Sequence, residues 1–180
     1  MDTNEPPCPE SVEQLAKRIF VDLHLTIVSY ESGSLAGDVE SVHDMRVAVR
    51  RLRVALSNFA VCTTKEDRKR LRLRLEKLAD ALGGVRDMDV MIASLKASST
   101  TRPEREKSAA SALIGRLRAR RRSRLRTLMN YLGGEEYAGF KRESPSDWIK
   151  MNGAYSSYES YKSRSEFPHA SPEEEHGQAA

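Results

Sequence analysis

One stretch of the chain reads His43-Asp-Met-Arg-Val-Ala-Val-Arg-Arg-Leu-Arg53 and predicts an amphipathic helix with one cationic side. Its charged residues His43, Arg46, Arg50 and Arg53 are three, four and three residues apart, so they fall along one helix face. Apolar residues repeat with the same rhythm about a third of a turn away: Val42, Met45, Val49, Leu52, Leu56 and Phe59. Soluble helices usually mix charges of both signs on their wet face. An unmixed cationic face therefore points to a polyanionic ligand.

The segments on either side of this stretch predict further amphipathic helices, at about 10–31, 38–61, 64–82, 86–96 and 101–132, with a short turn or helix at 135–142. Ser11 with Gln14 fits a capping box, Asp38 fits an N-cap, and either Thr63 or Thr64 starts the third helix. Gly83-Gly84 predicts a stop or bend there. Because no strand pattern occurs, we expect an all-α, antiparallel up-and-down bundle of four main helices.

Size and composition suit one small domain. The 180 residues are 39% hydrophobic but only 6% aromatic, which predicts an aliphatic core of packed helices. We expect a flexible leader over 1–9, the bundle over 10–143 and a disordered Ser/Tyr/Glu-rich tail over 144–180, from which Trp148 and Ile149 could dock on the bundle. No apolar run reaches the ~18 residues of a membrane span, and the polar start is unlike a signal peptide. These features favour a cytoplasmic protein that does not contact membranes.

Charge is distributed very unevenly along the chain. Residues 1–40 hold 2 basic and 8 acidic side chains, a net of −6, whereas residues 41–126 hold 23 basic and 9 acidic side chains, a net of +14. Most of these cations are arginines, whose guanidinium groups form forked hydrogen bonds to phosphate oxygens. Like-charged pairs four residues apart, such as Arg116 with Arg120, each cost roughly 0.2–0.5 kcal/mol on an exposed helix. A closely charged anion would recover that cost.

We therefore expect several helices to turn their cations toward one shared trough with salt-sensitive affinity. The predicted contacts are His43, Arg46, Arg50, Arg53, Arg70, Arg74, Lys77, Arg116, Arg120 and Arg124. Arg51 points away from the stripe, which favours an ion pair over a ligand contact. Asp87 and Asp89 are interpreted as structural carboxylates: Asp87 would cap a helix start after the glycine pair, and either one could orient arginines from neighbouring helices.

The sequence contains no pattern that is typical of a catalytic or metal-binding site. The chain has no Ser/His/Asp or Cys/His constellation, no histidine spacing for a metal and no glycine-rich phosphate loop, so we expect neither enzymatic activity nor a cofactor. For His43 two roles stay open, a hydrogen bond to phosphate or a structural bond near a helix start. Nucleic acid is an unlikely partner, because residues 41–126 contain one aromatic residue, Phe59, and bases need stacking surfaces.

Two motifs, in this order, give the chain a family resemblance. His43 to Arg53, followed by Leu82-Gly-Gly-Val-Arg-Asp-Met-Asp-Val90, resembles the CHAD domain, the conserved histidine α-helical domain, over about residues 10–142. The resemblance implies two similar four-helix bundles and a basic surface that binds inorganic polyphosphate, with some members at polyphosphate granules or linked to CYTH-type phosphohydrolases. It makes His43 the family's histidine. An accessory role beside such a phosphohydrolase is thus an alternative function.

The chain departs from the family in having one motif only, since His169 and His176 lack the arginine spacing. It corresponds to the N-terminal half of the two-bundle architecture. Such a half could pair with a second copy as a homodimer, bind weakly alone or be a decayed fragment. Opposite charge also suggests that Glu173–Glu175 folds back on the cationic trough.

Overall fold

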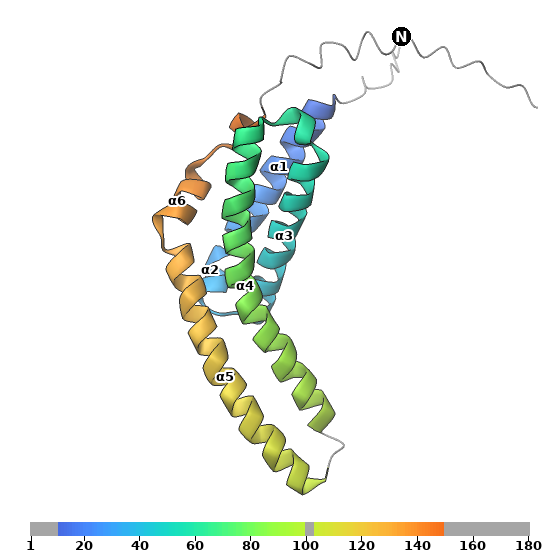
Figure 1. Ribbon diagram of the computed structural model, residues 1–180, viewed down its shortest axis with the longest axis vertical. Coiled ribbons are helices and arrows are strands. Elements are labelled where there is room, and N and C mark those ends of the chain that lie inside the picture. Colours follow the sequence, from blue (N-terminus) through green and yellow to red (C-terminus); the bar gives the residue numbers. More distant parts are fainter. Residues whose placement is uncertain (1–10, 100–102, 150–180) are drawn as a thin grey trace, which may run out of the picture.

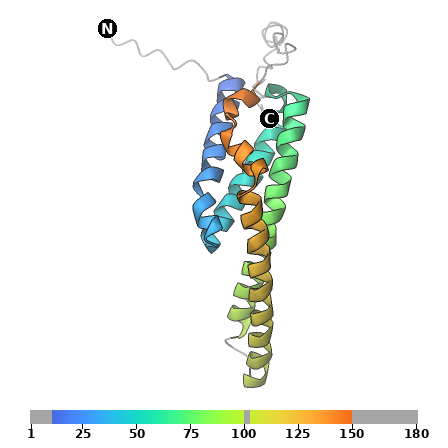
Figure 2. The same ribbon diagram turned by 90° about the vertical axis from the view of Figure 1, so that its left-hand side faces the viewer.

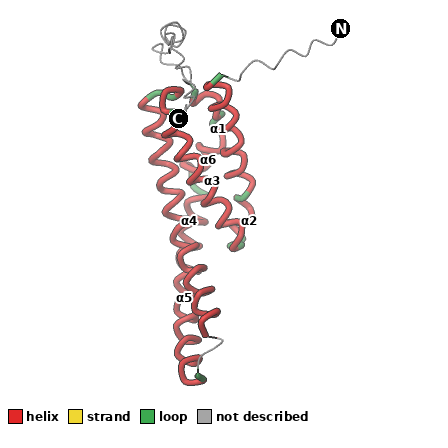
Figure 3. Tube along the Cα trace, turned by 90° about the vertical axis from the view of Figure 1, so that its right-hand side faces the viewer, coloured by secondary structure: helices red, strands yellow, loops and turns green. Residues whose placement is uncertain are grey.

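The computed structural model describes residues 11–99 and 103–149, and all regular elements in these two ranges are helices. Its elements are α1 (Val12–Ser29), α2 (Glu31–Leu35), α3 (Val39–Asn58), the 3₁₀ turn η1 (Ala60–Cys62), α4 (Lys65–Ser99), α5 (Glu104–Leu132), α6 (Glu135–Arg142) and the 3₁₀ turn η2 (Pro145–Trp148). Figure 3 shows helices and loops but no strand among the described residues. The all-α expectation is confirmed.

The long helices form a bundle from which one hairpin projects. α1, α3 and the first half of α4 lie side by side, and the α6–η2 segment packs against α4 and α1 (Figures 1 and 2). Beyond this bundle, the second half of α4 and the first half of α5 continue as a two-helix hairpin. The core is built from buried side chains of every long helix, including Phe20, Leu52, Leu75 and Leu128.

The predicted helix starts carry the predicted caps. Ser11 Oγ accepts a hydrogen bond from the Gln14 backbone N–H at 3.2 Å, and the Ser11 N–H donates to Gln14 Oε1 at 3.0 Å, which completes the capping box. Asp38 Oδ2 accepts from the Ser41 N–H at 2.8 Å. Of the two threonines left open, Thr64 fills the role for α4, because its Oγ accepts from the Asp67 N–H at 3.1 Å. Each cap satisfies a backbone donor that a helix start leaves unpaired.

Of the predicted stop or bend at Gly83-Gly84, the stop is wrong, whereas α4 does change direction about halfway along its length, where it leaves the bundle for the hairpin (Figure 1). α4 runs through both glycines as one 35-residue helix. Two glycines cost a helix about 1 kcal/mol each relative to alanine, but Leu82 and Val85 on either side are fully buried, and this packing keeps the helix intact. Asp87 accordingly caps no helix start; it lies exposed within α4. The helix expected over 10–31 corresponds to α1, and the short α2 follows it over Glu31–Leu35, where no helix was expected.

The described structure continues six residues past the expected bundle boundary at residue 143. Trp148 is 1% exposed and contacts Phe20, His24 and Phe140, so the expected docking of this residue is confirmed. Its indole Nε1 donates to Glu143 Oε2 at 3.2 Å. The leader predicted over 1–9 and the tail from residue 150 onward lie outside the described residues.

The hydroxyl of Tyr137 makes stability sensitive to alkaline pH. It is buried and has no hydrogen-bond partner among the described residues. Burial raises the pKa of Tyr137 far above its ordinary value of 10.0 and raises the pKa of Tyr131 to about 12. Both rings stay protonated in the folded state when those of the unfolded chain ionise, so stability falls as the pH rises above about 10.

We expect Tyr137→Phe to leave stability at pH 7 unchanged or higher, because it removes an unsatisfied polar group. The same substitution is expected to reduce the rate at which the free energy of unfolding falls with pH above pH 10. Urea unfolding at pH 7 and at pH 10.5 measures both effects. A variant with the wild-type alkaline slope would contradict the assignment.

Candidate cationic site

Two arginines from different helices each lie against one glycine of the pair in α4. A Cβ atom added at Gly83 would lie 3.9 Å from Nε of Arg46 on α3, and one added at Gly84 would lie 3.2 Å from Cδ of Arg124 on α5. The bare backbone lets both side chains lie close against α4 at consecutive residues. We call the four residues Arg46, Gly83, Gly84 and Arg124 the glycine saddle.

The positive charge at the saddle is not neutralised by the part of the chain that the structure describes. No carboxylate of that part lies within 4.0 Å of a guanidinium nitrogen of Arg46 or Arg124, and both side chains are exposed. One helix turn before Arg46, the half-buried His43 has an Nδ1 atom that is buried and makes no hydrogen bond to a described residue. The two arginines therefore offer accessible hydrogen-bond donors and a net positive charge, whereas Nδ1 of His43 is unpaired but buried.

The rest of the α3 stripe divides between two sides of the helix. Arg50 is exposed and lines an open groove between α3 and α1, together with Arg51. Arg53 is half-buried. Neither Arg50 nor Arg53 pairs with a carboxylate of the described residues. The expected ion pair of Arg51 is absent there too, and this side chain is exposed at the groove instead.

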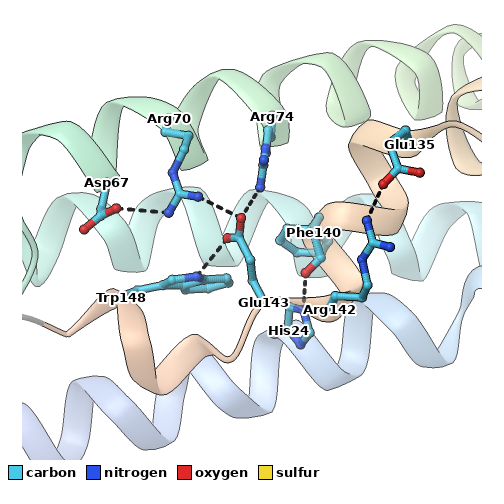
Figure 4. Close-up of polar contacts among 9 residues, drawn as sticks. All are labelled: His24, Asp67, Arg70, Arg74, Glu135, Phe140, Arg142, Glu143 and Trp148. Atoms are coloured by element: carbon cyan, nitrogen blue, oxygen red, sulfur yellow. Dashed lines mark hydrogen bonds and ion pairs between the residues drawn. The ribbon is translucent and has the colours of Figure 1, made fainter.

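Three of the predicted contacts face the C-terminal segment of the bundle. Glu143 accepts hydrogen bonds from Arg70 Nη1 at 2.8 Å and from Arg74 Nη1, as well as from the Trp148 indole (Figure 4). Lys77 Nζ donates to Glu136 of α6 at 3.0 Å. Arg70 and Arg74 thus hold the segment after α6 against α4, and their charge is largely balanced. The structure does not bring them into one continuous trough with the α3 stripe.

The predicted contacts on α5 lie along the hairpin. Arg116 and Arg120 are exposed, and they precede Arg124 at intervals of four residues, which places all three along one side of α5. Neither pairs with a carboxylate of the described ranges. A row of cations therefore leads along α5 to the saddle.

Arg121 forms a largely buried ion pair with Asp89, and no sequence pattern predicted a structural role for this particular arginine. Its guanidinium bonds to Asp89 of α4, with Nη2 to Oδ2 at 3.3 Å, and Nη2 donates to the Gly37 carbonyl at 2.8 Å. The side chains of Arg121 and Asp89 are 18% and 6% exposed. This confirms that one carboxylate of the Asp87/Asp89 pair orients an arginine. The sequence signal was weak, since Arg121 is one of seven arginines between residues 116 and 126.

The described residues form neither a metal site nor a membrane-spanning helix. They contain no group of three or more His, Cys, Asp or Glu placed to hold a metal ion. None of their helices combines the length and the apolar character that crossing a membrane requires.

The saddle predicts opposite effects of one substitution on stability and on ligand binding. Gly83→Ala places a methyl group at ordinary contact distance from Arg46, so the helix gains about 0.5–1 kcal/mol from the better helix former. The same methyl group hinders Arg46 from settling against α4 around a ligand. Thermal unfolding and binding titrations measure the two effects, and a destabilised variant would contradict the open geometry at Gly83.

Fold and surface define an all-helical protein with an arginine-rich face, and comparison with known families gives the particular class. The CHAD domain model matches residues 22–170, most of the chain, and the protein belongs to this family. The match ends well beyond residue 142, where the sequence resemblance was expected to stop, so it includes the segment after α6. A search of curated proteins finds no significant match.

Proposed function

We propose that this protein binds inorganic polyphosphate without enzymatic turnover, through the glycine saddle and the cationic residues beside it. One observation carries the proposal: Arg46 and Arg124 come from two helices, lie against consecutive glycines of α4 and have no carboxylate partner in the described part of the chain. His43 and Arg53 extend the site along α3, Arg50 adds a charge at the neighbouring groove between α3 and α1, and Arg116 and Arg120 extend the site along α5. We place the protein in the cytoplasm, at polyphosphate granules.

The chemistry of polyphosphate fits this arrangement. The polymer is flexible, carries at least one negative charge on every phosphate and has no bases. Guanidinium groups on either side of the saddle can bind successive phosphates, and each charge-assisted hydrogen bond contributes about 1.5–3 kcal/mol. Counterions released from the chain add to the affinity, so binding weakens steeply as salt increases.

Nucleic acid fits less well, because its bases need aromatic stacking partners. None of the described aromatic residues is exposed: Phe20, Tyr137, Phe140 and Trp148 are buried, and Tyr30, Phe59 and Tyr131 are half-buried. Family membership also favours polyphosphate, the ligand generally linked to CHAD domains.

A competition experiment tests the proposal. The full chain is titrated with fluorescently labelled polyphosphate, and unlabelled polyphosphate, single-stranded DNA and RNA of matched total charge compete for it over a series of salt concentrations. We expect polyphosphate to compete best at every salt concentration, with a steep dependence of log Kd on log salt. Equal competition by all three polymers would indicate an unselective cationic surface and overturn the proposal.

A further inference from the structure

A groove between α1 and α3 is left uncovered by the part of the chain that the structure describes. It has a volume of about 630 Å³, and its apolar walls come from both helices: Ile19, Leu23, Val47, Val54, Ala55 and Phe59. α6 packs against α4 and η2 against α1, and neither lines the groove (Figure 2). A continuous apolar surface that stays in contact with water is typical of a protein interaction site.

On α1 the groove belongs to a second apolar row beside the core face. The core face consists of the buried residues Ala16, Phe20, His24 and Ile27. The second row, at steps of three or four residues, consists of Val12, Leu15, Ile19 and Leu23. Val12 is 56% exposed, and the other three residues of this row are half-buried. Because steps of three and four residues are the spacing with which one helix packs along another, the second row suits a further helix.

On α3 a row with the same spacing forms the opposite wall of the groove. Its members, at steps of four, three and four residues, are Val47, Arg51, Val54 and Asn58. Val54, near the middle of the row, is 51% exposed. α1 and α3 run antiparallel, so the two rows form one surface along the helix pair (Figure 1). Two such surfaces placed face to face make the core of a four-helix bundle.

The charges at the rim of the groove differ between its two walls. Arg50 and Arg51 lie on the α3 wall, whereas Asp22 supplies a carboxylate on the α1 wall. All three residues are exposed, and none forms an ion pair with a residue of the described ranges. Such a surface is complementary to its own copy after rotation by half a turn about an axis along the helices, because each acidic wall then faces a basic one. Rotation about an axis across the helices would set arginines against arginines.

The helix pair is also large enough for a specific contact between two copies. α1 has 18 residues and α3 has 20. Helices of this size are about 27–30 Å long and about 10 Å wide, so the pair presents a face of roughly 500–600 Å². Two copies together would bury about 1,000–1,200 Å², which lies at the lower end of specific protein interfaces. This area favours a reversible dimer.

We propose that two copies of the chain associate through the α1/α3 groove as a symmetric dimer, in which α1 of each copy packs on α3 of the other. Ile19 and Val54 of both copies enter the shared core, and Asp22 of each copy faces Arg51 of the other. Arg46 of the glycine saddle does not line the groove, so the dimer interface and the saddle are separate surfaces.

Sedimentation equilibrium of the full chain tests this dimer, at protein concentrations up to about 100 µM because the expected Kd is micromolar. Val54→Glu places a charge at the centre of the interface and is expected to raise the dimer Kd at least about tenfold. The matched control is Leu73→Glu on α4, since Leu73 is also 51% exposed but does not line the groove. Circular dichroism and Trp148 fluorescence establish that each variant is folded. A wild-type chain that stays monomeric would overturn the proposal, and so would an equal Kd for the two variants.

A charge exchange between the two walls tests the orientation of the copies. Asp22→Arg and Arg51→Asp each set like charges against one another across the symmetric interface, so each variant alone is expected to dimerise severalfold more weakly. In a mixture of the two variants, opposite charges meet at both contacts, and heterodimers are expected to form with nearly the wild-type Kd. Arg46→Ala/Arg124→Ala should dimerise like the wild type, which separates this test from polyphosphate binding. A mixture that associates no better than its components would overturn the proposed pairing of α1 with α3.

Discussion

Replacing Arg46 and Arg124 together with alanine is expected to weaken polyphosphate binding by about 100-fold at low salt. Each substitution removes a charge-assisted contact worth about 1.5 kcal/mol or more, and 1.4 kcal/mol corresponds to a tenfold change in Kd. The slope of log Kd against log salt is also expected to become shallower by about 1–2, because fewer phosphates are neutralised. Titrations at four or five salt concentrations measure both quantities.

The matched control replaces Arg72 and Arg105, two exposed arginines outside the saddle, with alanine. Like the saddle variant, this control removes two positive charges from the protein, here one from α4 and one from α5. It therefore measures the contribution of overall charge alone. We expect a loss of affinity severalfold smaller than that of the saddle variant. Equal losses in the two variants would show that the ligand recognises diffuse charge and that the saddle is not a site.

Replacing Asp89 with alanine is expected to produce the largest loss of stability among the charged residues, about 3 kcal/mol. The substitution leaves the half-buried guanidinium of Arg121 without its carboxylate, and an unpaired charge that is largely removed from water is strongly destabilising. It also loosens the contact between α5 and the Gly37 carbonyl, in the turn where Gly37 has a positive φ of 74°. Urea unfolding followed by Trp148 fluorescence measures the change, with an unaltered m-value expected.

Glu135→Ala supplies the control for this experiment. Glu135 pairs with Arg142, but the two side chains are 82% and 69% exposed, so water screens the interaction and its loss should leave stability nearly unchanged. Combining Asp89→Ala with Arg121→Leu removes both charges and should restore much of the stability. If Asp89→Ala were as mild as Glu135→Ala, the pair would not tie α5 to α4 as described.

Much of the fold could be predicted from local patterns. The helical periods placed the long helices to within a few residues, and the caps at Ser11, Asp38 and Thr64 formed as expected. The glycine pair did not stop the helix, because glycine weakens a helix by an amount that packing readily outweighs. Leu82 and Val85 are fully buried, and the free energy that their packing contributes cannot be estimated from local sequence patterns.

For the candidate site, the sequence predicted the types of residue but not which of them lie close together. The sequence supplied a cationic stripe and several arginine clusters, but it could not show which cations face carboxylates. Arg70 and Arg74 share Glu143, which is about seventy residues away in sequence, and Arg121 shares Asp89. Arg46 and Arg124 reach neighbouring positions only because α3 and α5 both pack against α4.

The sequence by itself determined that this chain is helical, where the helices begin, and that an excess of arginine lies on α3, α4 and α5. These properties follow from interactions within one or two helical turns. Only the tertiary structure decided which arginines are neutralised and which remain available at the saddle. The physical reason is that Coulomb and hydrogen-bond energies depend on distance in space, and packing alone sets the distances between helices.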